Sequence, residues 1–381
     1  MSNIFRKVGI SIILSLCFTS LIGYTEVRAE NVDDDPWIAF AEDLKKAADV
    51  MLRDITPDDE LTRAQGYRYL SRLVRAALDL TLEFNDPNQP EIVRAYSKTT
   101  NPGALSSDAI YHMGFINSEA TYRVYGKRGN APLFEFGVYD GALGLDESSA
   151  LVGAMTEADL FVDAAGDYEI ILSPVKHAGN WIDTSKNASY LLIRQYAHRW
   201  HETESATFKI NKIAGVGTAR ALTVDLAASE LLRASAVVRQ LAYTYAGLVD
   251  RGMQSRANTL RVLPHNIDVS LPSGHRYATG WFKLEENEVL MLEFTPEQVP
   301  YWGIQLSNYW FEALDYEDQG SHLNNQTVHY EDDGSVKILI GSFIEGRNTL
   351  DTQGLRQGTI QFRWSRSELE VPRFKSTLIK R

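Results

Sequence analysis

Residues 119–139, EATYRVYGKRGNAPLFEFGVY, decide the fold because the apolar residues change their period there. On both sides of the turn at residues 127–130, aromatic and β-branched residues alternate with other residues. A period of two is typical of strands that bury one face. Residues 119–126 and 132–139 therefore predict two strands joined as a β-hairpin.

Downstream of this stretch the chain continues in short strand-like runs separated by turn residues. One helix interrupts them, because Thr223 can cap a segment with helical apolar spacing. Little alternation of strands and helices is left, so we expect a mainly β protein with an antiparallel β-sandwich or jelly-roll-like core. The expected strands cover residues 168–172, 190–196, 206–210, 280–283, 288–294, 302–309, 336–344 and 359–364.

The chain upstream of the strands has a helical pattern. Residues 37–52 space their apolar side chains at helical intervals, and a second such run ends at Phe84. The two runs predict a helical hairpin, which must pack on the rest of the chain because it cannot bury both faces alone. The expected units are an N-terminal helical segment at 30–107 and a β-rich sandwich domain at 108–381, with an inserted helix at 223–250.

The first thirty residues have the order of a secretory signal peptide. Arg6 and Lys7 precede an apolar run at residues 8–22, and small residues lie near a cleavage point after Ala29. The run is short for a membrane span. We expect cleavage to remove residues 1–29 and the mature chain to be periplasmic or secreted. Retention of the run as a membrane anchor is the alternative.

Composition limits the chemistry of the mature chain. The full sequence has a formal net charge of -12, which repels the phosphates of nucleic acids. The single cysteine, Cys17, lies in the expected signal peptide, so the mature chain would hold neither a disulfide nor a thiolate. We expect a small-molecule or saccharide partner, no nucleic acid, and no membrane span after signal cleavage. The sequence leaves the oligomeric state open.

Aromatic and amide side chains crowd residues 302–325. On the expected strand, Trp302 and Ile304 share one face, and Gly303 and Gln305 share the other. Rings offer flat apolar area and amides exchange hydrogen bonds with hydroxyl groups, so this surface is suited to a sugar or another polyol. The alternative is that the tryptophans belong to the core and the amides cap loops. The binding candidates here are Trp302, Gln305, Trp310 and Asn324.

Arginines near or within strands extend the set of binding candidates. Arg356 and Arg363 follow Asp351 and could hold a carboxylate or form a structural ion pair. Arg194 interrupts an apolar strand and must find a partner if it is buried. The acids that could pair with it are Asp140, Asp163 and Asp351.

Three residues are our candidates for proton transfer: Asp351, Glu293 and His322. Glu293 is the acid embedded in the apolar run 290–294, and its pKa should rise if it faces the core or a cleft. His322 has Asp315 upstream, so a mixed metal site is an alternative. Because no His-Glu-x-x-His motif is present, we expect neither a metal nor another cofactor.

Separated motifs along the chain suggest a family. They are YWGIQL at residues 301–306, SHLN at 321–324, LDT at 350–352, FRW at 362–364, FGVYD at 136–140, NWI at 180–182 and LIRQY at 192–196. With these motifs the chain resembles the domain of unknown function 1214 (DUF1214) family. The resemblance implies a β-rich, often secreted bacterial protein, and it implies no settled activity. Trp181, which lies in one motif, completes the binding candidates.

Two functions stay open at this point. The first is an exported enzyme of hydrolase or lyase type, acting on a hydroxyl-rich or carboxylate-bearing small molecule or saccharide. The crowding of polar groups in the C-terminal motifs favours it slightly. The alternative is a noncatalytic periplasmic protein that binds a glycan or small molecule. A carboxyl group of raised pKa beside an arginine in a cleft would favour catalysis, whereas an aromatic groove without perturbed groups would favour binding.

Overall fold

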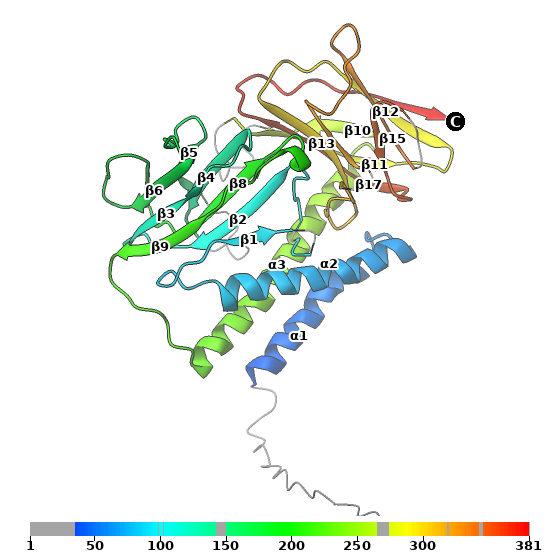
Figure 1. Ribbon diagram of the computed structural model, residues 1–381. Coiled ribbons are helices and arrows are strands. Elements are labelled where there is room, and N and C mark those ends of the chain that lie inside the picture. The colour runs from blue at the N-terminus through cyan, green and yellow to red at the C-terminus, as the bar shows by residue number, and fades with distance from the viewer. Residues whose placement is uncertain are drawn as a thin grey trace, which may run out of the picture.

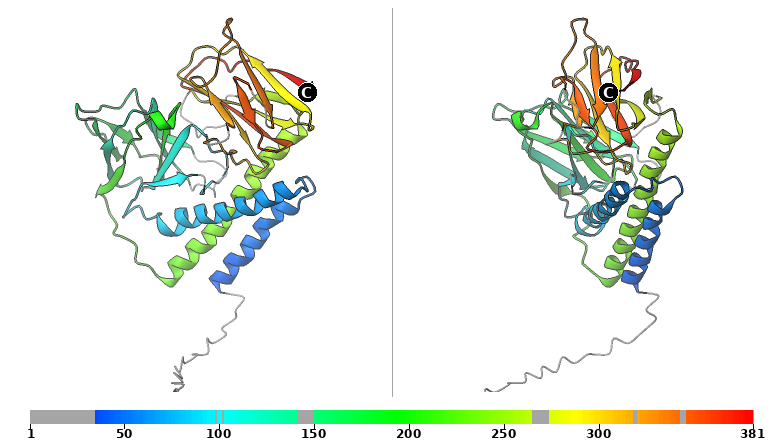
Figure 2. Two further views of the ribbon diagram at one scale, coloured as in Figure 1. Left: turned by 45° about the vertical axis from the view of Figure 1, so that its right-hand side comes forward. Right: turned by 90° about the vertical axis from the view of Figure 1, so that its right-hand side faces the viewer.

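Two β-sandwiches lie side by side above a layer of helices (Figures 1 and 2). The computed structural model describes residues 35–97, 99–101, 103–141, 150–264, 274–317, 320–342 and 346–380. These residues form three α-helices and 18 strands in four sheets. The mainly β fold with an N-terminal helical part and one long later helix is therefore confirmed. The expected signal peptide, residues 1–29, lies outside the described residues.

The N-terminal sandwich packs a five-stranded sheet on a four-stranded sheet. Alternate apolar residues such as Val124 and Phe136 fill the space between them. The five-stranded sheet has the order β1 (Val93–Tyr96), β2 (Ala109–Phe115), β8 (Tyr190–Tyr196), β4 (Leu133–Tyr139), β5 (Leu151–Thr156). The other sheet has the order β7 (Trp181–Asp183), β6 (Asp167–Ser173), β3 (Thr121–Lys127), β9 (Lys209–Ala214).

The C-terminal sandwich repeats this arrangement around a separate core. Trp302, Ile304 and Phe362 point into that core, so the expected alternation along residues 302–309 is confirmed for this face. The five-stranded sheet has the order β10 (Thr259–Val262), β11 (Arg276–Lys283), β17 (Gln357–Ser365), β13 (Tyr301–Ser307), β14 (His322–Asn324). The four-stranded sheet has the order β16 (Thr349–Asp351), β15 (Val336–Gly341), β12 (Glu288–Phe294), β18 (Lys375–Lys380).

The strands of residues 119–139 do not form the expected hairpin. β3 pairs with β6 and β9, whereas β4 pairs with β5 and β8 in the opposite sheet. The connecting loop instead bonds to a distant segment: Asn130 N–H donates to Glu204 O (3.0 Å) and Thr207 N–H donates to Lys127 O (2.9 Å). The expected single sandwich at 108–381 likewise contains two sandwiches.

Three helices cover one side of both sandwiches. They are α1 (Pro36–Ala48), followed by a 3₁₀ turn η2 (Asp49–Leu52); α2 (Glu60–Leu78), followed by a π-helical turn η3 (Asp79–Glu83); and α3 (Val224–Gln254). A short 3₁₀ turn, η4 (Trp200–Glu202), follows β8. Thr223 caps α3 as expected, because its Oγ1 accepts from Leu226 N–H (3.2 Å). Both α1 and α2 pack against α3.

The helical layer shares a core with the C-terminal sandwich. Tyr69 of α2 stacks on Trp310, which also donates from its indole nitrogen to Thr62 O (2.8 Å). Arg53, after η2, pairs with Asp250 of α3 (2.7 Å) and donates to Tyr309 Oη (2.7 Å). The helices are therefore fixed to the loop that follows β13. The helices in the described part of the chain lack an apolar stretch of the length that a bilayer requires.

We predict that Gly66→Ala destabilises the protein although alanine normally favours a helix by ~1 kcal/mol over glycine. A Cβ atom at Gly66 would lie 2.7 Å from Trp310 Cζ2 and 2.8 Å from Met51 Sδ. We expect a loss of ~1–2 kcal/mol in the free energy of unfolding, measured by urea denaturation, because the helices must move apart.

Gly247→Ala in α3 is the matched control. A Cβ atom there would meet only Arg251 Nη1, at 3.9 Å. This variant should keep its stability or gain up to ~1 kcal/mol. Equal gains in both variants would show that α2 does not pack tightly on Trp310.

Candidate functional site

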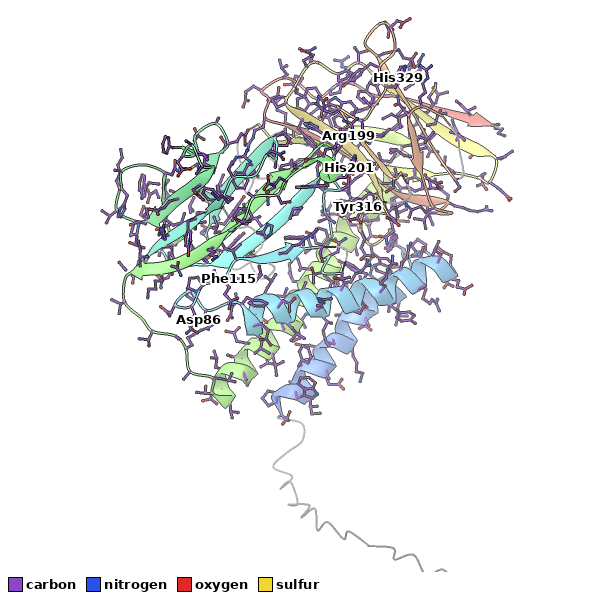
Figure 3. The ribbon with its side chains drawn as sticks, viewed as in Figure 1. Asp86, Phe115, Arg199, His201, Tyr316 and His329 are labelled. Carbon is purple, nitrogen blue, oxygen red and sulfur yellow. The ribbon has the colours of Figure 1, made fainter. Side chains whose placement is uncertain are left out.

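The polar outer faces of the two five-stranded sheets meet at what we call the seam, formed by β4 and β8 on one side and β13 and β17 on the other. Alternation places Trp302 and Ile304 in the core, so Gln305 and Arg363 on neighbouring strands face the seam. Buried polar groups of this kind need partners from the opposite side. At the solvent edge, Arg199 donates to Gln326 O (2.8 Å; Figure 3).

Two of the expected binding residues hold the segment that links β1 to β2. The Gln305 amide accepts from Ser107 N–H (2.9 Å) and donates to Leu105 O (2.7 Å). Arg363 donates to Ala104 O (2.8 Å). Both side chains are buried, so the structure uses them to join the sandwiches.

Asp108, which precedes β2, collects three donors from the C-terminal sandwich. It accepts from Tyr301 Oη (3.0 Å) and Asn324 Nδ2 (3.0 Å), and it contacts His322 Nε2 (3.2 Å). Burial raises the pKa of Tyr301 well above its usual value, which keeps the phenol a donor. The other ring nitrogen of His322 is buried without a described partner. The ring therefore presents no nitrogen to a substrate.

Glu135 of β4 is the centre of a second buried cluster. Its carboxylate contacts Arg194 Nη1 (2.9 Å), His275 Nε2 (3.1 Å) and Arg366 Nη2 (3.2 Å). Burial alone would raise the pKa of Glu135, but these three neighbours lower it to about 2. The partner of Arg194 is thus Glu135 and not Asp140, Asp163 or Asp351. Both residues interrupt apolar strands and lie opposite each other in register, which is the signal that the sequence offered.

Ser365 extends this cluster into a Ser-His-Glu chain. Its Oγ lies 3.0 Å from His275 Nδ1, whose ring contacts Glu135 on the other side. The arrangement resembles a catalytic triad in connectivity. However, Ser365 is 1% exposed and Glu135 is fully buried, so no substrate reaches the serine hydroxyl. We assign the chain of contacts to domain joining.

The remaining sequence candidates are dispersed over the molecule and do not form one site, which corrects their assignment as a common set of catalytic and binding residues. Trp302 and Trp310 are 1% exposed and belong to two different cores, as the alternative interpretation of the tryptophans predicts. The others are engaged elsewhere: Glu293 pairs with Lys375 (3.0 Å), Asp351 accepts from Gln353 N–H (2.7 Å), exposed Arg356 lies near Glu285 (3.7 Å) and Glu286 (3.6 Å), and Trp181 donates to Ser173 O (3.1 Å).

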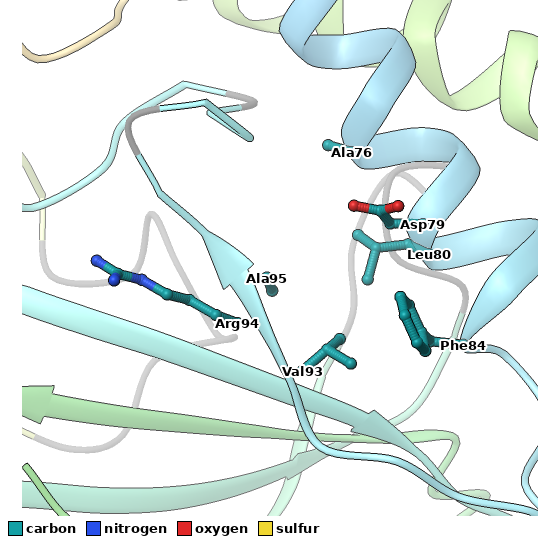
Figure 4. A pocket seen from close by; sticks show the side chains of 7 residues that line it. All are labelled: Ala76, Asp79, Leu80, Phe84, Val93, Arg94 and Ala95. Atoms are coloured by element: carbon teal, nitrogen blue, oxygen red, sulfur yellow. The ribbon is translucent and has the colours of Figure 1, made fainter.

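A cavity of about 220 Å³ lies between the end of α2, the turn η3 and strand β1 (Figure 4). Its apolar lining consists of Ala76, Leu80, Phe84, Val93 and Ala95. Asp79 is the acid in the lining, and its carboxylate points into the space between helix and strand. Arg94 also lines the cavity, although its guanidinium points away from the helix. Sequence reasoning missed this site because no strand was expected at β1.

Carboxyl groups of shifted pKa bear on the choice between catalysis and binding. Among the described residues four carboxyl groups have clearly shifted pKa values, and each of these shifts is downward. Hydrogen bonds lower the pKa of Asp43 (from Lys46), of Asp183 (from Ser185) and of Asp333 (from Ser335), and Glu135 is described above. Within the described ranges, no group of three or more His, Cys, Asp or Glu side chains is placed to hold a metal ion.

These features define a class of two-sandwich proteins with a helical layer. A crystal structure of an uncharacterized protein from Burkholderia cenocepacia matches 91% of this chain and 96% of its own, with 30% sequence identity and a TM-score of 0.86. The chain belongs to the same family as that protein. A Vibrio parahaemolyticus structure matches 88% of this chain and 100% of its own at 11% identity, and its TM-score of 0.46 supports no conclusion. No family model and no curated protein matches.

We predict that Glu135→Gln lowers the free energy of unfolding at pH 7 by ~3 kcal/mol or more, because Arg194 and Arg366 lose a buried counter-charge. The folded-state pKa of Glu135, about 2, lies below its usual 4.5. Its contribution is therefore present above pH 4.5 and is lost as the pH falls towards 2. Urea denaturation across this window should show a smaller loss in the variant than in the wild type.

Glu293→Gln is the control, since it also removes a strand carboxylate with a cationic partner. Lys375 is 73% exposed, so this change should cost less than ~1 kcal/mol. Equal costs for the two variants would contradict the central position of Glu135 in the seam.

Proposed function

We propose that the protein is a noncatalytic binding protein of the periplasm or the medium, with the cavity between η3 and β1 as its small-molecule site. The carrying observation is a small cavity of about 220 Å³ that combines five apolar side chains with Arg94 and the inward-pointing carboxylate of Asp79. Binding sites for small molecules usually combine apolar walls with a few polar groups that orient the ligand. The signal-like order of residues 1–29 supports the proposed export.

The backbone of the cavity wall supports this proposal. Phe84 N–H donates to Asp79 O (3.0 Å), which is the five-residue hydrogen bond of a π-helical turn. Turns of this type are rare and are frequently found at functional sites. Leu80, the second residue of this turn, packs on a buried cluster that contains Tyr139 and Met113. This packing holds the cavity wall against the N-terminal sandwich.

The enzyme interpretation has less support from the geometry. Asp351 accepts a hydrogen bond from Gln353, and Glu293 pairs with Lys375 elsewhere in the sandwich. One ring nitrogen of His322 contacts Asp108, and the other is buried. The aromatic and amide platform expected for a saccharide is also internal, because Trp302, Trp310, Gln305 and Asn324 are buried. A small molecule is therefore favoured over a glycan. The motifs at 301–306 and 362–364 also lead us to propose membership in the DUF1214 family.

We predict that Ala95→Leu prevents ligand binding, since the larger side chain occupies the cavity that Ala95 lines. A small-molecule library would be screened by thermal shift, and hits would be measured by calorimetry. Compounds that stabilise the wild-type protein should bind Ala95→Leu at least about tenfold more weakly, as expected when ligand volume is lost.

Ala41→Leu, on the exposed side of α1, is the matched control and should bind as the wild type does. Val93→Phe provides a second obstruction from a partly exposed position, in case Ala95→Leu unfolds. Undiminished binding to a folded, obstructed variant would place the site elsewhere and overturn the proposal.

A further inference from the structure

We infer that the ligand of this cavity is a small organic cation, an amine with an apolar body. The inference rests on the proposed function and deepens it by naming the ligand class. It also departs from the carboxylate-bearing ligand that the sequence suggested. The inference depends on the carboxylate of Asp79 and on two nearby arginines that do not pair with it.

Asp79 has no side-chain hydrogen bond or ion pair with any residue that the structure describes. It is partly buried at the first position of η3, and its carboxylate faces the cavity (Figure 4). Partial removal from water destabilises a carboxylate, and a charge-assisted hydrogen bond to a cation offsets this loss. The cavity therefore contains a negative group that none of the described residues neutralises.

Two arginines lie near this carboxylate, and both are turned to other groups. Arg94 points away from the helix, and its Nε donates to Tyr96 O (3.3 Å). Arg75 is one helical turn before Asp79, but its guanidinium donates to Thr99 Oγ1 (3.3 Å). Neither forms an ion pair with Asp79, so neither arginine occupies the position beside the carboxylate that a ligand would take.

The walls around Asp79 suit the rest of an amine. Phe84 lies five residues further on, across the π-helical turn, so both side chains come from one side of the cavity. Aromatic rings attract cations, and Leu80 and Val93 add apolar surface. The chain as a whole carries a formal charge of -12, which favours the approach of cations. A carboxylate ligand would instead be repelled by Asp79.

Three matched probes separate amine, alcohol and acid: 2-phenylethylamine, 2-phenylethanol and 3-phenylpropanoate. Calorimetry at pH 7 with the full chain should show the amine binding at least about tenfold more tightly than the alcohol, since only the amine can form a charge-assisted hydrogen bond. The acid should not bind. A higher salt concentration should weaken the binding of the amine and leave the binding of the alcohol unchanged.

Asp79→Asn keeps the shape of the side chain and removes its charge. This variant should lose about tenfold in affinity for 2-phenylethylamine and keep its affinity for 2-phenylethanol. Glu83→Gln is the control, since it removes an exposed carboxylate of the same turn that does not line the cavity, and it should leave all three affinities within about twofold.

The outcomes separate this inference from the proposed function. The amine inference is overturned if Asp79→Asn binds the amine as the wild type does, or if the acid binds best of the three probes. In either case, loss of binding in Ala95→Leu would still support the cavity as the binding site. If Ala95→Leu leaves the affinity of a bound probe unchanged, both conclusions are lost. Failure of the wild-type protein to bind any of the three probes also overturns the inference.

Discussion

The joint between the two sandwiches depends on the carboxylate of Glu135, whose ionic partners come from both of them. Glu135 and Arg194 lie on the outer face of one five-stranded sheet, and His275 and Arg366 lie beside the other. Separating the sandwiches would expose this buried ionic cluster together with the Asp108 contacts. Because losing one partner of a buried ionic cluster costs several kcal/mol, any shift of one sandwich along the other that keeps these groups buried is disfavoured. The helical layer and the cavity wall pack against these two sandwiches.

Sequence patterns predicted the elements better than their partners. Runs such as residues 190–196 and 288–294 coincide with strands β8 and β12, and Thr223 begins α3 as expected. The pairing of residues 119–139 failed for a physical reason. Alternation records which face of a strand is buried, and the two strands bury theirs from opposite sides of one core. Strand partners are set by long-range packing that a local period does not contain.

The candidate site was predicted poorly because polar crowding has two causes. Gln305, Asn324, Arg363 and Arg194 stood out as polar residues in apolar surroundings, and this signal was real, but it marks the joint between sandwiches. The cavity gives almost no local signal. Its lining comes from a helix end and an edge strand, and each residue is ordinary in its own segment. Only the fold brings Asp79 opposite β1.

The shared core of helices and C-terminal sandwich has a consequence for the order of folding. Tyr69 finds its aromatic neighbour at Trp310, and Arg53 finds Tyr309, more than two hundred positions later. A chain that emerges from its N-terminus must keep the apolar faces of α1 and α2 uncovered until most of the polypeptide has followed. Contacts this distant make folding slow and leave the early segments prone to aggregation. The N-terminal helices therefore complete their core only after Trp281, Tyr309 and Trp310 have been made.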